Sequence, residues 1–195
     1  NDPTPGDNGP DNGNGNERIP STAGAPHPLS TPSNGSVSSV RTIKDHAGRI
    51  TALWTQTPTT GSATNLFVRR YIPGTGWQNT EALETLNGDT QPPITTVDSN
   101  NIVTIAWAQA NASQWKLYAR RYHPSNGLET THELTDGILS GTKMIVGAND
   151  NTAIFWTEES GSYHRLYVSW YQNNNWTVRE AISIVNTAGD VGEFH

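Results

Sequence analysis

The sequence predicts an all-β fold made of β-propeller-type repeats of four antiparallel strands, with about three blades present as a partial propeller. Three tryptophans each end a short apolar run and each follows a glycine by 19 residues; they are Trp54, Trp107 and Trp156. Tyrosines 71, 122 and 171 recur at intervals of 51 and 49 residues. A unit of this length cannot bury its own hydrophobic face, so neighbouring copies must stack.

The second repeat shows the expected layout of one blade. Apolar and β-branched residues predict strands over residues 92–98, 102–109, 116–124 and 128–134. The residues Asp98-Ser-Asn-Asn predict a turn, because Asp and Asn tolerate left-handed backbone and bond to nearby amides. No segment shows helical periodicity.

The other two repeats follow the same course. Strands are expected over 40–45, 49–56, 66–73 and 77–84 in the first, and over 143–147, 152–159, 166–172 and 176–183 in the third. A β-sandwich also has many short strands and stays open as an alternative. A sandwich gives no reason for one motif to recur in register three times, which favours the propeller.

Domain boundaries follow from composition and from the repeat. Residues 1–36 contain six Asn, seven Pro and six Gly, and predict a linker or N-terminal arm. Repeats are expected over 37–88, 89–137 and 138–188, with a fourth beginning at 189–195. Because this fourth repeat stops inside a strand, we expect either a longer natural chain or ring closure by several copies.

Composition restricts the partners. Twelve basic and 18 acidic residues give a net charge of −6, which argues against nucleic acid as a partner. The chain has no Cys and no apolar run of the roughly 20 residues that span a bilayer. The arm is typical of proteins of the extracellular space, the cell surface or the periplasm, where a lipid anchor is an option. We expect the arm to contact a protein partner or further copies of the chain.

At this point the chain resembles the tandem propeller repeats of bacterial secreted and surface proteins, which are similar in general look to sialidase-type propellers. The resemblance covers residues 36–195 and rests on an Asp nine residues before Trp54 and Trp107, on Arg-Tyr pairs at 70–71 and 121–122, and on Gly-Trp at 76–77. It departs from the sialidase pattern because the Asp turn joins the first and second strands, and because Gly147 replaces the Asp in the third repeat.

Neither a catalytic centre nor a cofactor or metal site is predicted. The six histidines show no ligand spacing, and no nucleophile or phosphate-loop motif is present. Glu158 shares its position with Gln56 and Gln109, two residues after each repeated Trp, which indicates a structural hydrogen bond rather than catalysis. The arginine pairs 69–70 and 120–121 are interpreted as side chains whose aliphatic stems pack at blade edges and whose guanidinium heads are solvated.

A ligand site is predicted at one end of the blades. Trp115 is expected in the loop between second and third strands, at the position of His164, which Tyr163 precedes. Asp89 and Asp136 lie in the connections between blades, which share that face of a propeller. Aromatic rings beside carboxylates can stack on sugars while the polar groups bond to hydroxyls. Exposed aromatic side chains without a ligand remain the alternative.

Three functions stay open. The first is a non-catalytic extracellular recognition or assembly module that binds a glycan or a protein. The second is part of a propeller-fold carbohydrate-active enzyme whose catalytic residues lie outside this sequence. The third is a structural component of a surface layer or filament.

Overall fold

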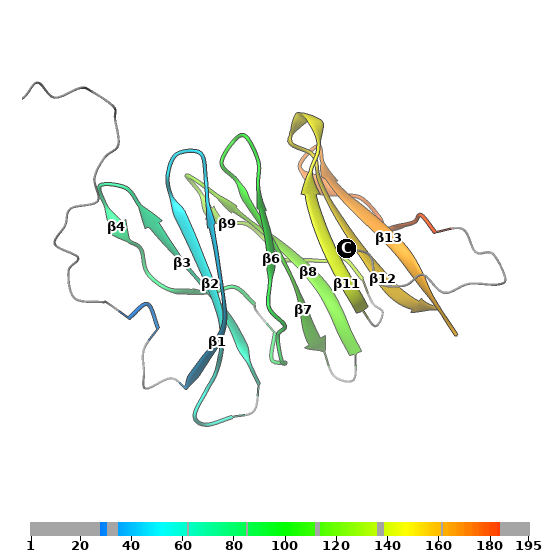
Figure 1. Ribbon diagram of the computed structural model, residues 1–195, viewed down its shortest axis with the longest axis horizontal. Coiled ribbons are helices and arrows are strands. Elements are labelled where there is room, and N and C mark those ends of the chain that lie inside the picture. Colours follow the sequence, from blue (N-terminus) through cyan, green and yellow to red (C-terminus); the bar gives the residue numbers. More distant parts are fainter. Residues whose placement is uncertain are drawn as a thin grey trace, which may run out of the picture.

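The computed structural model describes residues 28–30, 35–61, 63–84, 86–111, 114–135, 139–160 and 162–183. Three antiparallel sheets follow one another along the chain and lie side by side in one layer (Figure 1). Each has the four antiparallel strands that the repeat predicts, and one extra short strand that it does not predict. We call them blade 1 (β1–β5), blade 2 (β6–β10) and blade 3 (β11–β15). In the described residues no helix is long and apolar enough to cross a bilayer.

Blade 1 consists of β1 (Ser36–Lys44), β2 (Ile50–Thr57), β3 (Asn65–Ile72), β4 (Gly76–Trp77) and β5 (Glu81–Ala82). β1 begins earlier than the expected residue 40, at the last residue assigned to the arm. The expected fourth strand is split into two short pieces, and both pair with β3.

Blades 2 and 3 repeat this plan. Blade 2 contains β6 (Ile94–Val97), β7 (Val103–Asn111), β8 (Gln114–His123), β9 (Gly127–Leu128) and β10 (His132–Glu133). Blade 3 contains β11 (Leu139–Val146), the 3-10 turn η2 (Ala148–Asp150), β12 (Thr152–Ser160), β13 (Tyr163–Gln172), β14 (Asn175–Trp176) and β15 (Glu180–Ala181). The expected fourth repeat at 189–195 lies outside the described residues.

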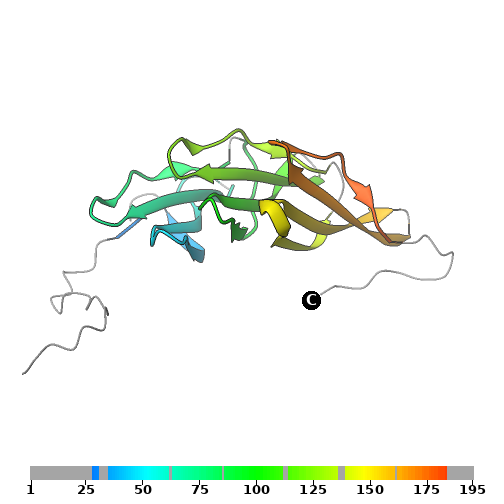
Figure 2. The same ribbon diagram turned by 90° about the horizontal axis from the view of Figure 1, so that it is seen from above.

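The first strands β1, β6 and β11 run along one side of the layer, and β6 contacts both of its counterparts (Figure 2). The fourth strands lie on the opposite side. β6 is shorter than expected because Pro92 and Pro93 have no N–H to give to a ladder. This arrangement of first strands along one edge and fourth strands along the other is that of consecutive propeller blades.

The repeated tryptophans occupy equivalent places, as the sequence predicts. They lie on the second strands β2, β7 and β12, and each pairs across the sheet with an aromatic residue of the third strand. The stacked ring pairs are Trp54–Phe67 at 5.9 Å, Trp107–Tyr118 at 5.8 Å and Trp156–Tyr167 at 6.2 Å between centroids. All three indoles are buried.

Two hydrophobic clusters join neighbouring blades. The first brings residues of blade 1, among them Leu53 and Val68, against Trp107 and other residues of blade 2. The second brings Ala119 and other residues of blade 2 against Trp156 of blade 3. Blade 2 therefore presents one face to blade 1 and the other to blade 3, which is the stacking that the repeat requires.

The glycines that precede the tryptophans mark close backbone contacts. A Cβ at Gly35 would lie 1.9 Å from the carbonyl oxygen of Thr57, and one at Gly88 would lie 1.9 Å from that of Ala110. In both blades the incoming chain thus crosses the end of the second strand where no side chain fits. The third glycine, Gly137, lies outside the described residues.

Candidate functional site

The blades have two ends. The turn end carries the connections between first and second strands and between third and fourth strands, at the top of Figure 1. The loop end carries the connections between second and third strands. The sequence places the candidate ligand residues at the loop end, whereas the more elaborate polar structure lies at the turn end.

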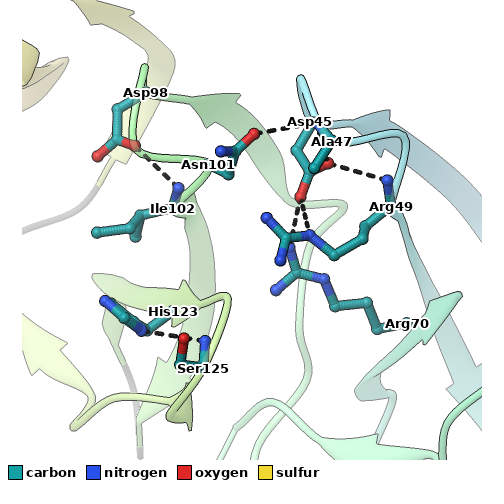
Figure 3. Close-up of polar contacts among 9 residues, drawn as sticks. All are labelled: Asp45, Ala47, Arg49, Arg70, Asp98, Asn101, Ile102, His123 and Ser125. Atoms are coloured by element: carbon teal, nitrogen blue, oxygen red, sulfur yellow. Dashed lines mark hydrogen bonds and ion pairs between the residues drawn. The ribbon is translucent and has the colours of Figure 1, made fainter. Parts of the chain in front are cut away.

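Asp45 organises the turn end of blade 1 (Figure 3). Its Oδ1 accepts hydrogen bonds from the backbone N–H groups of Ala47 at 3.0 Å and Arg49 at 2.9 Å. Its Oδ2 accepts from Arg49 Nε at 2.7 Å and from Arg70 Nη2 at 2.8 Å. The carboxylate therefore closes the turn and binds a guanidinium from the third strand.

Two opposing influences act on the Asp45 carboxyl. Burial alone would raise its pKa, but the hydrogen bonds and charge of Arg49 and the hydrogen bond of Arg70 outweigh burial and hold the pKa below its usual value. Arg70 itself is buried, with 2% of its surface exposed. Burial lowers the pKa of its guanidinium although Asp45 opposes the shift.

Blade 2 repeats this arrangement. Asp98 Oδ1 accepts from the backbone N–H of Ile102 at 2.8 Å, and Asp98 Oδ2 accepts from Arg121 Nη2 at 3.0 Å. Arg121 is buried at 7% exposure. The interpretation of Arg70 and Arg121 as solvated heads at blade edges is therefore wrong, because each guanidinium is held inside by its own turn aspartate.

Each buried arginine also contacts the next blade. The guanidinium carbon of Arg70 lies 4.7 Å from the ring centroid of Tyr122, and that of Arg121 lies 4.0 Å from that of Tyr171. These are cation–π distances. Two of the three recurring tyrosines, Tyr122 and Tyr171, thus stack against the arginine of the preceding blade.

Hydrogen bonds between the turns connect the blades further. Asn101 Oδ1 accepts from the backbone N–H of Ala47 at 3.2 Å (Figure 3). Ser99 donates from its backbone N–H and its hydroxyl to Asp150 at 2.9 and 2.6 Å, and Asn100 Nδ2 donates to the same carboxylate at 2.9 Å. The bonds from Ser99 lower the pKa of Asp150. The three turns therefore form one continuous polar surface.

Blade 3 lacks the Asp–Arg pair. Gly147 stands at the position of Asp45 and Asp98, and Trp170 stands at that of Arg70 and Arg121. At the junction with blade 2, a cavity of about 210 Å³ opens between the turn of blade 2 and residues 149–151 and 171–174 of blade 3. Its wall includes Arg121, Tyr171, Asp150 and a set of amide side chains, namely Asn149, Asn151, Gln172, Asn173 and Asn174.

The backbone explains why so many asparagines line this cavity. Asn149, Asp150, Asn173 and Asn174 all have positive φ, between 51° and 62°. Asn and Asp adopt that conformation more readily than other non-glycine residues. The turns thus place amide groups that both donate and accept hydrogen bonds around one hollow.

The polar residue two positions after each Trp has a structural role, as expected. The indole Nε1 groups donate to Gln56 at 3.3 Å, to Gln109 at 3.2 Å and to Glu158 at 2.7 Å. Gln56 and Gln109 donate in turn to the carbonyls of Gly35 and Gly88, which anchors the incoming chain. Glu158 cannot donate, and instead accepts from Arg179 Nη1 at 3.0 Å and from Thr135 Oγ1.

The residues predicted to bind a ligand lie at the loop end, but mostly on strands. Trp115 belongs to β8, and Tyr163 and His164 open β13, so the expectation that Trp115 lies in a loop is wrong. The hairpins of the second and third strands include residues at their ends that are polar and that the sequence predicts to be loops. Tyr163 is 46% exposed, whereas Trp115 and His164 are half-buried.

Asp89 has a structural partner. Its Oδ1 accepts from the backbone N–H of Thr64 at 2.8 Å, which ties the connection between blades 1 and 2 to the loop of blade 1. Asp136 lies outside the described residues. A shared ligand site of Trp115, Tyr163, His164, Asp89 and Asp136 therefore stays a prediction.

Sequence reasoning missed the turn-end cavity. A signal was present, since runs of Asn and Asp at 149–151 and 173–175 fall in the turns of one blade. Their meeting with Arg121 of the preceding blade depends on how the blades stack, which no local pattern shows. Among the described residues, no three His, Asp or Glu side chains are grouped so as to hold a metal ion.

The comparisons with known proteins leave the family open. No protein-family model matches the chain, and no curated protein matches it.

Proposed function

We propose that the chain is a non-catalytic, propeller-type recognition module of the extracellular space or cell surface, and that it binds a neutral, hydroxyl-rich ligand such as a glycan at its turn end. The observation that carries this proposal is the cavity of about 210 Å³ between blades 2 and 3, with its amide-lined wall. The cavity is smaller than the roughly 300–1,000 Å³ typical of drug-sized ligands. It therefore suits one sugar unit of a longer chain.

The chemistry of the wall supports a neutral polar ligand. A sugar hydroxyl both donates and accepts, and the side-chain amides of Asn149, Asn151 and Asn174 offer both functions. The carboxylate of Asp98 is already bonded to Arg121, and that of Asp150 to Ser99 and Asn100. Arg121 balances the charge of Asp98, whereas Asp150 keeps one negative charge with its oxygens bonded to neutral donors, so the site disfavours anions and offers hydrogen bonds to a neutral ligand.

The frame of the cavity supports binding at low entropic cost. The Asp98–Arg121 pair and the stacking of Arg121 on Tyr171 fix the floor across two blades. The bonds from Ser99 and Asn100 to Asp150 fix one side. A preformed site of this kind loses little freedom when a ligand binds.

A glycan array probed with the purified chain tests the proposal. We expect binding to a defined set of glycans that falls at least tenfold in the double variant Asn151→Ala/Asn174→Ala, because these side chains lie on the cavity wall rather than in the hydrophobic clusters. Trp115→Ala is the matched control at the loop end and should bind as the wild type does. Binding that survives the turn-end double variant but is lost in Trp115→Ala would move the site to the loop end, and absence of any glycan binding would contradict the proposal.

A further inference from the structure

A second arginine position repeats on the outer side of the blades. In blade 1, Arg69 donates from Nε to the carbonyl of Gln78 at 2.6 Å and from Nη1 to that of Leu29 at 3.3 Å. In blade 2, Arg120 donates from Nε to the backbone carbonyl of Glu129 at 2.6 Å and from Nη1 to that of Leu83 at 2.9 Å. Each guanidinium thus joins its own fourth strand to a leucine carbonyl of the chain segment before its blade.

The contact with Leu29 shows how general this bridge is. Residues 28–30 belong to the arm, and the carbonyl of Leu29 accepts hydrogen bonds from Arg69 and Thr80 of blade 1. Leu29 meets Arg69 as Leu83 meets Arg120. An arginine guanidinium therefore bridges two backbone carbonyls at the start of blade 1, and a second arginine does the same at the start of blade 2.

Blade 3 has lost this cation. Ser169 occupies the equivalent position, opposite Ile154, as Arg69 is opposite Ala52 and Arg120 opposite Ile105. The Ser169 hydroxyl keeps one of the two bonds, to the carbonyl of Thr177 at 2.8 Å. The other acceptor, the carbonyl of Leu134, receives no hydrogen bond from the residues that the structure describes.

A hollow lies beside the two residues whose carbonyls an arginine would bridge. A cavity of about 530 Å³ opens between β10 and β14, and both Leu134 and Thr177 line it. The charged groups beside it are paired with one another: Glu133 with Lys116 at 2.5 Å, and Arg179 with Glu158 at 3.0 Å. The Leu134 carbonyl remains as an acceptor at a position where both other blades hold an arginine.

We propose that this cavity binds the guanidinium of an arginine side chain presented by a partner protein. The planar guanidinium donates in a fixed fork, and the same fork already spans the matching carbonyls in blades 1 and 2. Val178, which is 90% exposed at the edge of the cavity, offers apolar surface to the stem of such a side chain or to the residue beside it. The site lies on the outer side of the blades, and the inference does not rest on the proposed glycan site.

The test uses Nα-acetyl-arginine amide as the probe and the citrulline analogue as its neutral isostere. In amide-resolved NMR titrations of the whole chain, we expect the arginine probe to shift the amides of Leu134, Thr135 and Thr177 and to bind at least tenfold more tightly than the citrulline probe. Equal affinity for both probes, or shifts confined to other parts of the chain, would overturn the proposal.

The variant Ser169→Arg supplies the cation from within. Its guanidinium should span Thr177 and Leu134 as Arg120 spans Glu129 and Leu83, so binding of the arginine probe should fall at least tenfold while the variant melts at or above the wild-type temperature. A folded Ser169→Arg protein that binds the probe unchanged would contradict the proposal. Should that variant not fold, the wild-type comparison of arginine and citrulline probes still decides.

Discussion

Blades 1 and 2 keep one set of polar contacts, whereas blade 3 keeps the strands and replaces the contacts. Asp45 with Arg70 and Asp98 with Arg121 are equivalent pairs. Their counterparts in blade 3 are Gly147 and Trp170, and its backbone nevertheless pairs in the same register. The shared fold therefore depends on the apolar strands and the stacked aromatic pairs, and the Asp–Arg pair is an addition that one blade can lose as a whole.

Two further replacements in blade 3 are also linked. The amide of Gln109 becomes the carboxylate of Glu158, and Thr131, two residues after Glu129, becomes Arg179, which bonds to Glu158. The arginine at 120 becomes Ser169. Both cavities with a proposed ligand lie at the junction of blades 2 and 3. Blade 3 therefore lacks or replaces the polar contacts that blades 1 and 2 share, at the junction where both ligands are proposed to bind.

The largest effect is expected when one partner of a buried pair is removed in blade 1. Asp45→Ala leaves the Arg70 guanidinium buried without its carboxylate, and should lower the free energy of unfolding by about 3–5 kcal/mol. Chemical denaturation of the whole chain measures this. The matched change in blade 3, Gly147→Ala, should cost less than about 1 kcal/mol, since its Cβ meets only Asn151 O at 3.6 Å. Equal losses in the two variants would remove the distinction between the blades.

The next effect concerns the close approach at the entry to blade 2. Gly88→Ala would place a Cβ 1.9 Å from the Ala110 carbonyl oxygen, so the backbone must shift. We expect a loss of about 1–3 kcal/mol in the same denaturation experiment. Gly74→Ala tests the effect of positive φ alone, because nothing lies within 4 Å of its Cβ. A smaller loss at Gly88 than at Gly74 would show that the in-register glycines are not required for close packing.

A smaller effect is expected from the linked replacement in blade 3. Glu158→Gln and Arg179→Thr each remove one side of an ion pair that is partly open to solvent on the arginine side, and each should cost about 1 kcal/mol. The double variant restores the residue types of blade 2, so its loss should be smaller than the sum of the two. A double-mutant cycle by thermal unfolding gives this coupling energy, which should lie between about 0.5 and 2 kcal/mol. Strict additivity would mean that the two replacements are independent.

The smallest expected effects are two weak dependences of stability on pH in blade 1, and they have opposite signs. The lowered pKa of Asp45 means that its stabilisation is complete above the unfolded value near 3.8 and is lost as the pH falls through the lower folded value. Burial raises the pKa of Glu84, although a hydrogen bond from the backbone N–H of Leu66 opposes the shift. Above about pH 4.5, stability should therefore fall as the pH rises through the raised folded value. Glu84→Gln should remove this second slope in melting temperatures measured from pH 3 to 8, and an unchanged slope would contradict the assignment.

Much of the fold could be predicted because its signals are local and recur. The positions of Trp54 and Trp107 on second strands follow from apolar runs in register, and the role of Gln56 and Gln109 follows from their fixed offset. The split of the fourth strand into β4 and β5 could not be predicted, since its residues alternate too weakly to show a break.

The polar contacts were largely hidden from the sequence. Arg70 and Arg121 each stand beside another arginine in a strand, a pattern that predicts side chains at a blade edge. Only the turn aspartates, 25 and 23 residues away in the sequence, explain why these two arginines are buried. How far the tryptophan of the first part of the fourth strand is exposed also depends on the neighbouring blade. Trp176 is buried against blade 2, whereas Trp77, in the first blade, is 37% exposed.

The central claim is that ligands bind this protein at the junction of blades 2 and 3. Amide-resolved NMR mapping with a glycan identified on the array tests it most directly. The account predicts shifts in the turns at 98–102, 149–151 and 172–175, and none in the equivalent turn of blade 1 at 45–49. Shifts centred on residues 45–49, or on Trp115 and Tyr163 at the loop end, would contradict it.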